Sequence, residues 1–278
     1  MARKSGQVLP ASRIPHGSCC WRPGPTCAWR ALRPWGPTRQ NIARKPLREN
    51  HLADSNFAWI DTARQALPQA IRLLGQLRPS IHVADLRAID SDFLERHGTR
   101  AILWDVDGTL MGHHGHAVDP IFREAFDRLL ARPGLKHALL SNCGEARFLE
   151  LGRLFPELPV LRAYATPAGL VRRRLLRGED RWSDPDPATL RSSIRRKIAK
   201  PSVALFDCAL EELGMADRSK LLMVGDQYFT DIAGANLAGV PSVKVATHRR
   251  DSFPLPLRTF QRVEQLLYAM RYPGERGS

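Results

Sequence analysis

The stretch AILWDVDGTL, from Ala101 to Leu110, decides the fold. Its first four residues are apolar and are followed at once by two carboxylates and a glycine, which is the pattern of a buried parallel strand ending in a turn. Side chains alternate along a strand, so we expect Asp105 and Asp107 on one side and Val106 on the other. Ligands of open α/β sheets bind just beyond the carboxyl ends of the strands. The stretch therefore predicts a site in which two acids share one ligand.

Polar residues follow two other apolar runs. The run Ala138–Leu140 stops at Ser141, whose hydroxyl can donate to a phosphate oxygen, and Asn142 comes next. The run LLMVG at positions 221–225 leads into two further carboxylates, Asp226 and Asp231. If these runs are parallel strands of one sheet, their polar ends meet at the same edge.

A fixed positive charge and a metal ion complete the predicted site. Lys200, in the sequence AKPS, precedes a helical stretch and offers the charge. Carboxylates that cluster without cysteine or histidine ligands are the oxygen donors that Mg²⁺ prefers. The sequence therefore predicts a magnesium site among these acids.

Strand and helix patterns alternate along the chain, which predicts an α/β fold with a doubly wound parallel sheet. The expected strands are Ala101–Asp105, His137–Ser141, a short one near Val160, Leu221–Gly225 and Ser242–Val245. The expected helices are Pro120–Leu130, Glu145–Leu154, Ser202–Leu213, Thr230–Ala238 and Phe260–Arg271.

Four short motifs occur in a fixed order at these positions: Asp-X-Asp-Gly-Thr at 105–109, Ser-Asn at 141–142, Lys-Pro at 200–201 and Gly-Asp-X4-Asp at 225–231. In this the chain resembles the haloacid dehalogenase-like (HAD) phosphatases, which have a Rossmann-like fold. From Pro79 to about Val245 it is similar to the subclass IIIA, YqeG-type branch, which includes phosphatidylglycerophosphate phosphatases.

The resemblance implies a role for each catalytic residue. Asp105 would be the nucleophile that forms an aspartyl-phosphate, and Asp107 would be the general acid and later the base. Lys200 would neutralise charge on the phosphoryl group, and Asp231 would orient Lys200 or a metal-bound water. Gly108 permits the tight backbone of the turn.

The same resemblance implies the binding residues. Mg²⁺ would lie between the Asp105 carboxylate, the backbone carbonyl of Asp107 and the Asp226 carboxylate. The phosphate oxygens would be held by three polar residues: Thr109, Ser141 and Asn142.

Charge and composition divide the chain into segments. The net charge is +14, and residues 1–50 hold ten basic residues against one acid, Glu49. We expect 1–50 to be a disordered basic leader, either a mitochondrial transit peptide or the product of a start codon set too far upstream. Residues 51–78 are expected to form an amphipathic helical segment, which either lies on a membrane or packs on the domain.

Residues 79–278 would then form the HAD-like phosphatase domain, with an insertion at about 160–200. The related branch has a short connection there, so we expect a small basic cap or a loop. Its basic runs Arg172–Arg174 and Arg195–Lys197 fit either anionic lipid head groups or a solvated face, and both interpretations stay open.

The sequence thus predicts a Mg²⁺-dependent phosphomonoesterase, with phosphatidylglycerophosphate as the first substrate hypothesis. A phosphatase of a soluble metabolite is one alternative, and a basic protein that binds nucleic acid or anionic lipid with a vestigial site is another. The intact set Asp105, Asp107, Lys200 and Asp226 argues against this last alternative, and nucleic acid is not the expected partner. No apolar run is long enough to span a bilayer. We therefore expect the cytoplasm or the inner face of a membrane, or the mitochondrial matrix if the leader is a transit peptide.

Overall fold

A computed structural model of the chain describes residues 70–183, 193–194 and 196–275. All of them belong to one compact unit. The predicted leader, residues 1–50, lies outside the described residues, as does most of the predicted helical segment 51–78. Of that segment the structure describes helix α2 (Ala70–Leu74) and the residues after it.

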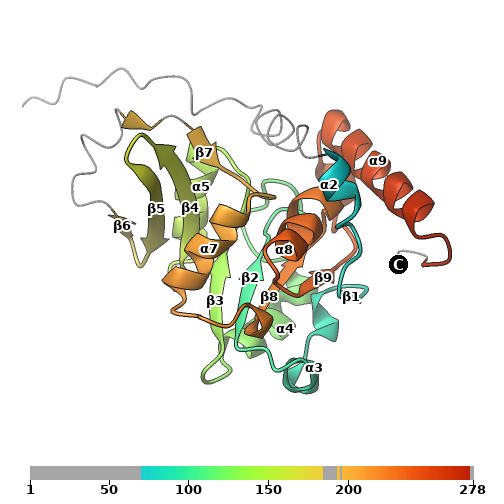
Figure 1. Ribbon diagram of the computed structural model, residues 1–278. Helices are drawn as coiled ribbons and strands as arrows, with labels where there is room; N and C mark the ends of the chain where they lie inside the picture. The colour runs from blue at the N-terminus through green and yellow to red at the C-terminus, as the bar shows by residue number, and fades with distance from the viewer. Residues whose placement is uncertain (1–69, 184–192, 195, 276–278) are drawn as a thin grey trace, which may run out of the picture. The chain divides into compact units, whose positions relative to one another are not determined.

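Nine strands of the described chain form one sheet, in the order β1-β9-β8-β2-β3-β4-β5-β6, with β7 paired to β4 (Figure 1). Their bounds are β1 Ile81–His82, β2 Ala101–Trp104, β3 Lys136–Leu139, β4 Val160–Thr166, β5 Gly169–Leu176, β6 Glu179–Trp182, β7 Arg196–Ile198, β8 Leu221–Gly225 and β9 Ser242–Lys244. The pairs from β1 to β4 along this order are parallel. The predicted α/β class is confirmed, although the sheet is mixed because its other pairs are antiparallel.

Helices cover both faces of the parallel part. The chain-order bounds are α3 Ser91–Arg96, α4 Pro120–Leu130, α5 Glu145–Leu154, α7 Val203–Glu212, α8 Ala233–Leu237 and α9 Leu255–Arg271. One core cluster packs α3, α4 and α5 on β2, and a second packs α7 and α8 on the opposite face. Strand β2 is buried on both sides, which is why its residues read as one apolar run rather than as an alternation.

Local signals explain the helix positions. Helix α4 begins where expected because the Asp119 carboxylate accepts from the backbone N–H of Ile121 and Pro120 occupies the first turn. Helix α9 begins at Leu255, five residues earlier than predicted, because Pro256 in its first turn is compatible with a helix start. The predicted helix 230–238 is divided into a π-helical turn, Tyr228–Ile232, followed by α8.

The segment after Pro159, which was expected to be a small cap or a loop, forms four strands in its described residues. Strands β4 and β5 form a long antiparallel pair, and β6 and β7 extend it. Three consecutive arginines hide the alternating pattern of β5 in the sequence. In the structure Val171, Arg173 and Leu175 are buried on one side of the strand. Arg172 and Arg174 lie on the other side and are partly exposed. Among the described helices, none combines the length and apolar character needed to cross a bilayer.

Candidate active site

The two central strands bring Asp105 and Asp226 to the same edge of the sheet. Strands β2 and β8 are parallel neighbours, with Trp104 opposite Val224. Asp105 follows Trp104 directly, Asp226 follows Gly225 at the end of β8, and the backbone N–H of Asp105 donates to the Val224 carbonyl at 2.9 Å. Both carboxylates therefore lie at the same end of the sheet, as the sequence predicts.

Lys200 joins the nucleophile candidate to the last acid of the motif. Its Nζ lies 2.6 Å from Oδ1 of Asp105 and 2.6 Å from Oδ1 of Asp231. The side chains of Lys200 and Asp231 are almost completely buried. Burial alone would lower the pKa of Lys200, but the two carboxylates outweigh it and raise that pKa above its usual value. The lysine is therefore a permanent positive charge at the site.

Within the described chain Asp226 forms no ion pair like those of Lys200, although the charge of Lys244 favours its ionised form. Both of its carboxylate oxygens are buried and neither makes a hydrogen bond of ordinary geometry within the described chain, although Thr247 lies near enough to favour its charge weakly. Burial, and then the charge of Asp231, raise the pKa of Asp226 to about 6. Ligand atoms of Asp105, Asp226 and Asp231 all lie within 4.8 Å of one another. Unpaired buried carboxylate oxygens in a group of hard donors fit a divalent cation such as Mg²⁺.

Two glycines make room for this group. Gly108 has φ of +94°, and a Cβ there would lie 2.8 Å from Oδ2 of Asp226 and 3.0 Å from the Phe253 ring. A Cβ at Gly225 would lie 2.4 Å from the Asp231 carboxylate. Side chains at these positions would displace the acids, so the glycines are required by the packing of the site itself.

The predicted phosphate-binding residues have different surroundings. Thr109 is buried, and its hydroxyl donates to Oδ2 of Asp105 over a long 3.4 Å. Ser141 is half-buried beyond the end of β3. Both ends of the Asn142 amide bond to the backbone of Lys200, at 2.8 Å to its N–H and 2.9 Å to its carbonyl. Asn142 therefore connects the loop after β3 to the residue that carries the fixed charge.

Asp107 lies beside an arginine that sequence reasoning missed. Oδ1 of Asp107 accepts from Nη2 of Arg147 at 2.7 Å and from the backbone N–H of His114 at 3.0 Å. Arg147 is buried in α5, and it also donates to Glu150 at 2.9 Å and to the Gly115 carbonyl at 2.8 Å. In the sequence Arg147 is visible only as an arginine on a predicted helix, five residues after the Ser-Asn motif. No local pattern indicates that its side chain contacts Asp107.

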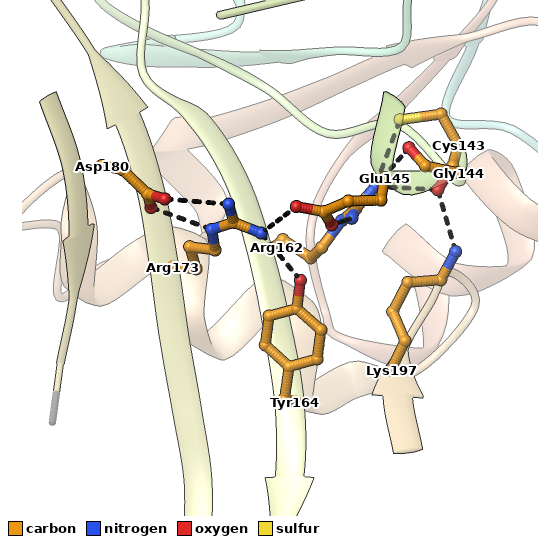
Figure 2. Close-up of polar contacts among 8 residues, drawn as sticks. All are labelled: Cys143, Gly144, Glu145, Arg162, Tyr164, Arg173, Asp180 and Lys197. Carbon is orange, nitrogen blue, oxygen red and sulfur yellow. Dashed lines mark hydrogen bonds and ion pairs between the residues drawn. The ribbon is translucent and has the colours of Figure 1, made fainter. Parts of the chain in front are cut away.

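The basic segment 160–198 contacts the loop that follows Ser141 (Figure 2). Arg162 donates to the carbonyls of Cys143 and Gly144 at 2.8 and 2.9 Å, and Nζ of Lys197 reaches the same Cys143 carbonyl at 2.9 Å. Arg162 also pairs with Glu145 at 2.6 Å. Two cations of the segment therefore hold the backbone of the loop.

A second arginine, Arg173, connects Glu145 to strand β6. Arg173 pairs with Glu145 at 2.5 Å and makes two bonds of 2.8 Å to Asp180 (Figure 2). Its neighbours pair with α7: Arg172 with Glu211, and Arg174 with Glu212. The run Arg172–Arg174 thus has acidic partners within the fold, which leaves less of its charge for lipid head groups.

A buried acid on α9 was also not foreseen. Glu264 is 1% exposed and accepts from the backbone N–H of Phe229 at 2.8 Å, in the π-helical turn that carries Asp231. Burial raises the pKa of Glu264 to about 8. Helix α9 is therefore fixed directly behind the acid group.

Comparison with known proteins agrees with this geometry. Residues 197–256 match a family model described as HAD-hydrolase-like. Over 231 residues the chain is 27% identical to phosphatidylglycerophosphate phosphatase 1, chloroplastic/mitochondrial, of Arabidopsis thaliana, covering 77% of this chain and 57% of that protein. Over 54 residues it is 44% identical to the pyrimidine 5'-nucleotidase YjjG of Escherichia coli K12, covering 19% of this chain and 24% of that one. The chain thus spans less than two thirds of either relative.

Solved structures resemble it only distantly. A protein of Listeria monocytogenes serotype 4b described as uncharacterized has 18% identity and a TM-score of 0.32, covering 60% of this chain and 98% of its own. A 4-nitrophenylphosphatase of Thermotoga maritima has 13% identity and a TM-score of 0.25, covering 55% and 88%.

Proposed function

The chain is a HAD-like hydrolase, and from that premise we propose that it is a Mg²⁺-dependent phosphomonoesterase that works through an aspartyl-phosphate, with phosphatidylglycerophosphate as its substrate. One observation supports the chemistry above all others. Lys200 bridges Asp105 and Asp231 in a buried group, while Asp226 beside them has two unpaired oxygens. A group of three acids and one lysine suits a metal ion together with an anionic phosphate.

In the first step Asp105 attacks phosphorus. Lys200 and Thr109 hold its carboxylate in place, with the shorter bond on Oδ1. An oxygen–phosphorus bond forms to Asp105 as the bond to the leaving oxygen breaks, and the leaving oxygen takes a proton from Asp107. The charge of Lys200 offsets that of the transferred phosphoryl group.

In the second step water attacks the aspartyl-phosphate. Asp107 now accepts the proton of that water, and Asp105 is released with inorganic phosphate. The described hydrogen bonds of Asp107 all reach Oδ1, so Oδ2 would be the atom that holds the moving proton. Arg147 and the His114 backbone fix the orientation of the carboxylate in both steps.

The resemblance to HAD-like phosphatases supports the remaining roles. Mg²⁺, held by Asp105, Asp226 and the backbone carbonyl of Asp107, would supply positive charge that offsets the repulsion between carboxylate and phosphate. Ser141 would donate to a phosphate oxygen, and Asn142 would act mainly by positioning Lys200, since both ends of its amide are bonded there.

The substrate assignment is supported by the Arabidopsis relative, whose name states that activity, and by the similarity over 77% of this chain. The organelles in that name also support the mitochondrial matrix as the compartment. A soluble nucleotide is the second candidate, because the 44% match to a pyrimidine 5'-nucleotidase, although short, is the higher identity.

The test is phosphate release by the full chain with Mg²⁺, measured in parallel from phosphatidylglycerophosphate in mixed micelles and from soluble phosphomonoesters, including pyrimidine nucleotides. Asp105→Asn is the control, because it keeps the shape of the side chain and removes the nucleophile. We expect lipid hydrolysis that is lost in the variant. Preference for nucleotides would keep the mechanism and replace the substrate, whereas no release that depends on Asp105 would favour the binding protein with a vestigial site.

A further inference from the structure

Helix α9 presents an apolar stripe away from the fold. Its inward residues, Gln261, Glu264 and Tyr268, are buried. Spacings of eight, three and four residues place four other side chains on one outer face of the helix. These are exposed to an unusual degree for large apolar residues: Leu255 at 68%, Val263 at 45%, Leu266 at 59% and Met270 at 69%.

The charges of this helix have one sign at its surface. Its single acid, Glu264, is buried, whereas Arg262 and Arg271 are exposed and Arg258 is half-exposed. None of the three arginines has an acidic ion-pair partner within the described chain. Helix α2 lies beside α9 (Figure 1), and its Ile71 is 88% exposed. The outer face of α9 also carries the exposed Thr259, but the only exposed charges of α9 are these arginines. An apolar stripe on a helix whose exposed charges are all basic is typical of helices that lie in the plane of a membrane interface.

The stripe begins next to the candidate active site. Phe253, two residues before Leu255, contacts the turn at Gly108 and packs against His113 with ring centroids 4.8 Å apart. On its inner face α9 binds the π-helical turn through Glu264 and Phe229. A surface on which the outer face of α9 rests would therefore lie close to the site.

We propose that the outer face of α9, with Ile71, docks on an anionic phospholipid bilayer. The four apolar side chains and Ile71 enter the boundary of the acyl chains, and the arginines contact lipid phosphates. A second copy of the chain fits this face less well, because a symmetric contact would bring the arginines of both copies together. The docking rests on the proposed function for its biological purpose. It would place the active site at the membrane surface that holds a phospholipid substrate.

The test is co-sedimentation of the full chain with vesicles of phosphatidylcholine, with and without phosphatidylglycerol. One variant, Leu266→Ser with Met270→Ser, removes apolar contact, and another, Arg258→Gln with Arg262→Gln, removes charge. Matched controls on α4 are Ile121→Ser, where the parent residue is 53% exposed, and Arg123→Gln, whose side chain is 62% exposed. Circular dichroism confirms that each variant is folded.

We expect the parent protein and both controls to bind anionic vesicles far better than neutral ones. The serine variant should lose at least roughly tenfold in the partition coefficient. The glutamine variant should lose roughly fivefold for each arginine at low salt and less at high salt. Hydrolysis of a soluble phosphomonoester should be the same in all of these proteins, because the outer face of α9 contacts no residue of the site.

Three results would overturn the docking: no vesicle binding by the parent, equal binding by parent and α9 variants, or a parent dimer in solution that the α9 variants abolish. These are distinct from failure of the proposed function. Vesicle binding that depends on α9, in a protein that hydrolyses no ester, would retain the docking and reject the enzyme. Lipid hydrolysis that the α9 variants leave unaffected would retain the enzyme and reject the docking.

Discussion

A single buried arginine holds the proposed general acid. Arg147 donates to Asp107 at 2.7 Å and is itself fixed by Glu150 and the Gly115 carbonyl. Without it the Asp107 carboxylate would keep only the His114 backbone bond and would lose its orientation. A proton donor that is misplaced by about 1 Å loses much of its effect on the rate.

We therefore expect Arg147→Gln to lower kcat roughly 100-fold, with KM little changed, on a soluble phosphomonoester. The pH profile of kcat should shift as well, which a merely structural role would not produce. The double variant with Asp107→Asn should be hardly slower than Asp107→Asn alone, because the two residues act as one unit. Additive losses would contradict this role.

Gly108 offers a test of the space around Asp226. Its φ is +94° and a Cβ would meet Oδ2 of Asp226 at 2.8 Å. Gly108→Ala should lower Mg²⁺-dependent turnover roughly 100-fold by displacing that carboxylate. Gly134→Ala is the matched control, since Gly134 has φ of +78° and nothing within 4 Å of its Cβ position. If both variants kept full turnover, the close contact at Gly108 would have no catalytic consequence.

At the scale of elements, Glu145 joins the β4–β6 strands to the parallel sheet. It accepts from Arg162 on β4 and from Arg173 on β5, and both arginines are buried. Removing this carboxylate leaves the buried Arg162 without an acidic partner in the described chain, whereas Arg173 keeps Asp180. A buried charge that loses its partner is strongly destabilising. The pairing therefore matters far more than an ion pair at the surface.

We expect Glu145→Gln to lower the free energy of unfolding by about 3 kcal/mol, measured by urea denaturation. Glu157→Gln is the control: Glu157 pairs with Arg177, both side chains are mostly exposed, and such pairs contribute little. Turnover should also fall in Glu145→Gln, because Arg162 holds the loop next to Ser141. Equal free energies of unfolding for the two variants would show that the ion pairs of Glu145 with Arg162 and Arg173 do not stabilise the fold.

The sequence predicted the elements whose local signals agree with the fold. Helices α4 and α5 have the expected bounds, since Asp119 caps α4 and an apolar period of helical spacing runs through both. After Pro159 the sequence predicts only a short strand near Val160, where β4 begins. Strand β5 was not predicted, because Arg173 is buried by virtue of partners outside its own strand, Glu145 and Asp180. The roles of Arg147 and Glu264 could not be predicted either, since both side chains are positioned by the packing of segments far apart in the chain.

At the scale of the whole molecule, a buried histidine couples stability to pH. His137 accepts from the Trp104 indole at 3.2 Å, and its other ring nitrogen lies 3.1 Å from the Leu129 carbonyl. That arrangement requires the neutral ring. Burial lowers the pKa of His137 to about 4 from an ordinary value of 6.5. Between these values only the unfolded chain takes up the proton, so stability is lost as pH falls from about 6.5 towards 4.

We expect the parent protein to lose on the order of 2 kcal/mol more than His137→Gln when urea denaturation is compared at pH 7 and pH 5. The comparison with a variant is needed because Glu264, with a pKa of about 8, acts in the opposite sense: its contribution falls as pH rises. His116→Gln, at an exposed position, should behave like the parent. An unchanged pH dependence in His137→Gln would contradict the assignment.

The outer strands of the sheet bear on how the protein avoids aggregation. Strand β1 has two residues, and β6 presents the charged residues Glu179, Asp180 and Arg181. Short or charged edges are poor templates for pairing with another chain. Without residues 169–198, β4 would instead offer seven residues, mostly buried in the folded protein, to any neighbouring molecule. Strands β5, β6 and β7 thus prevent other molecules from pairing with the edge of β4. A chain that lacks residues 169–198 would be prone to form cross-β fibres, in addition to losing activity.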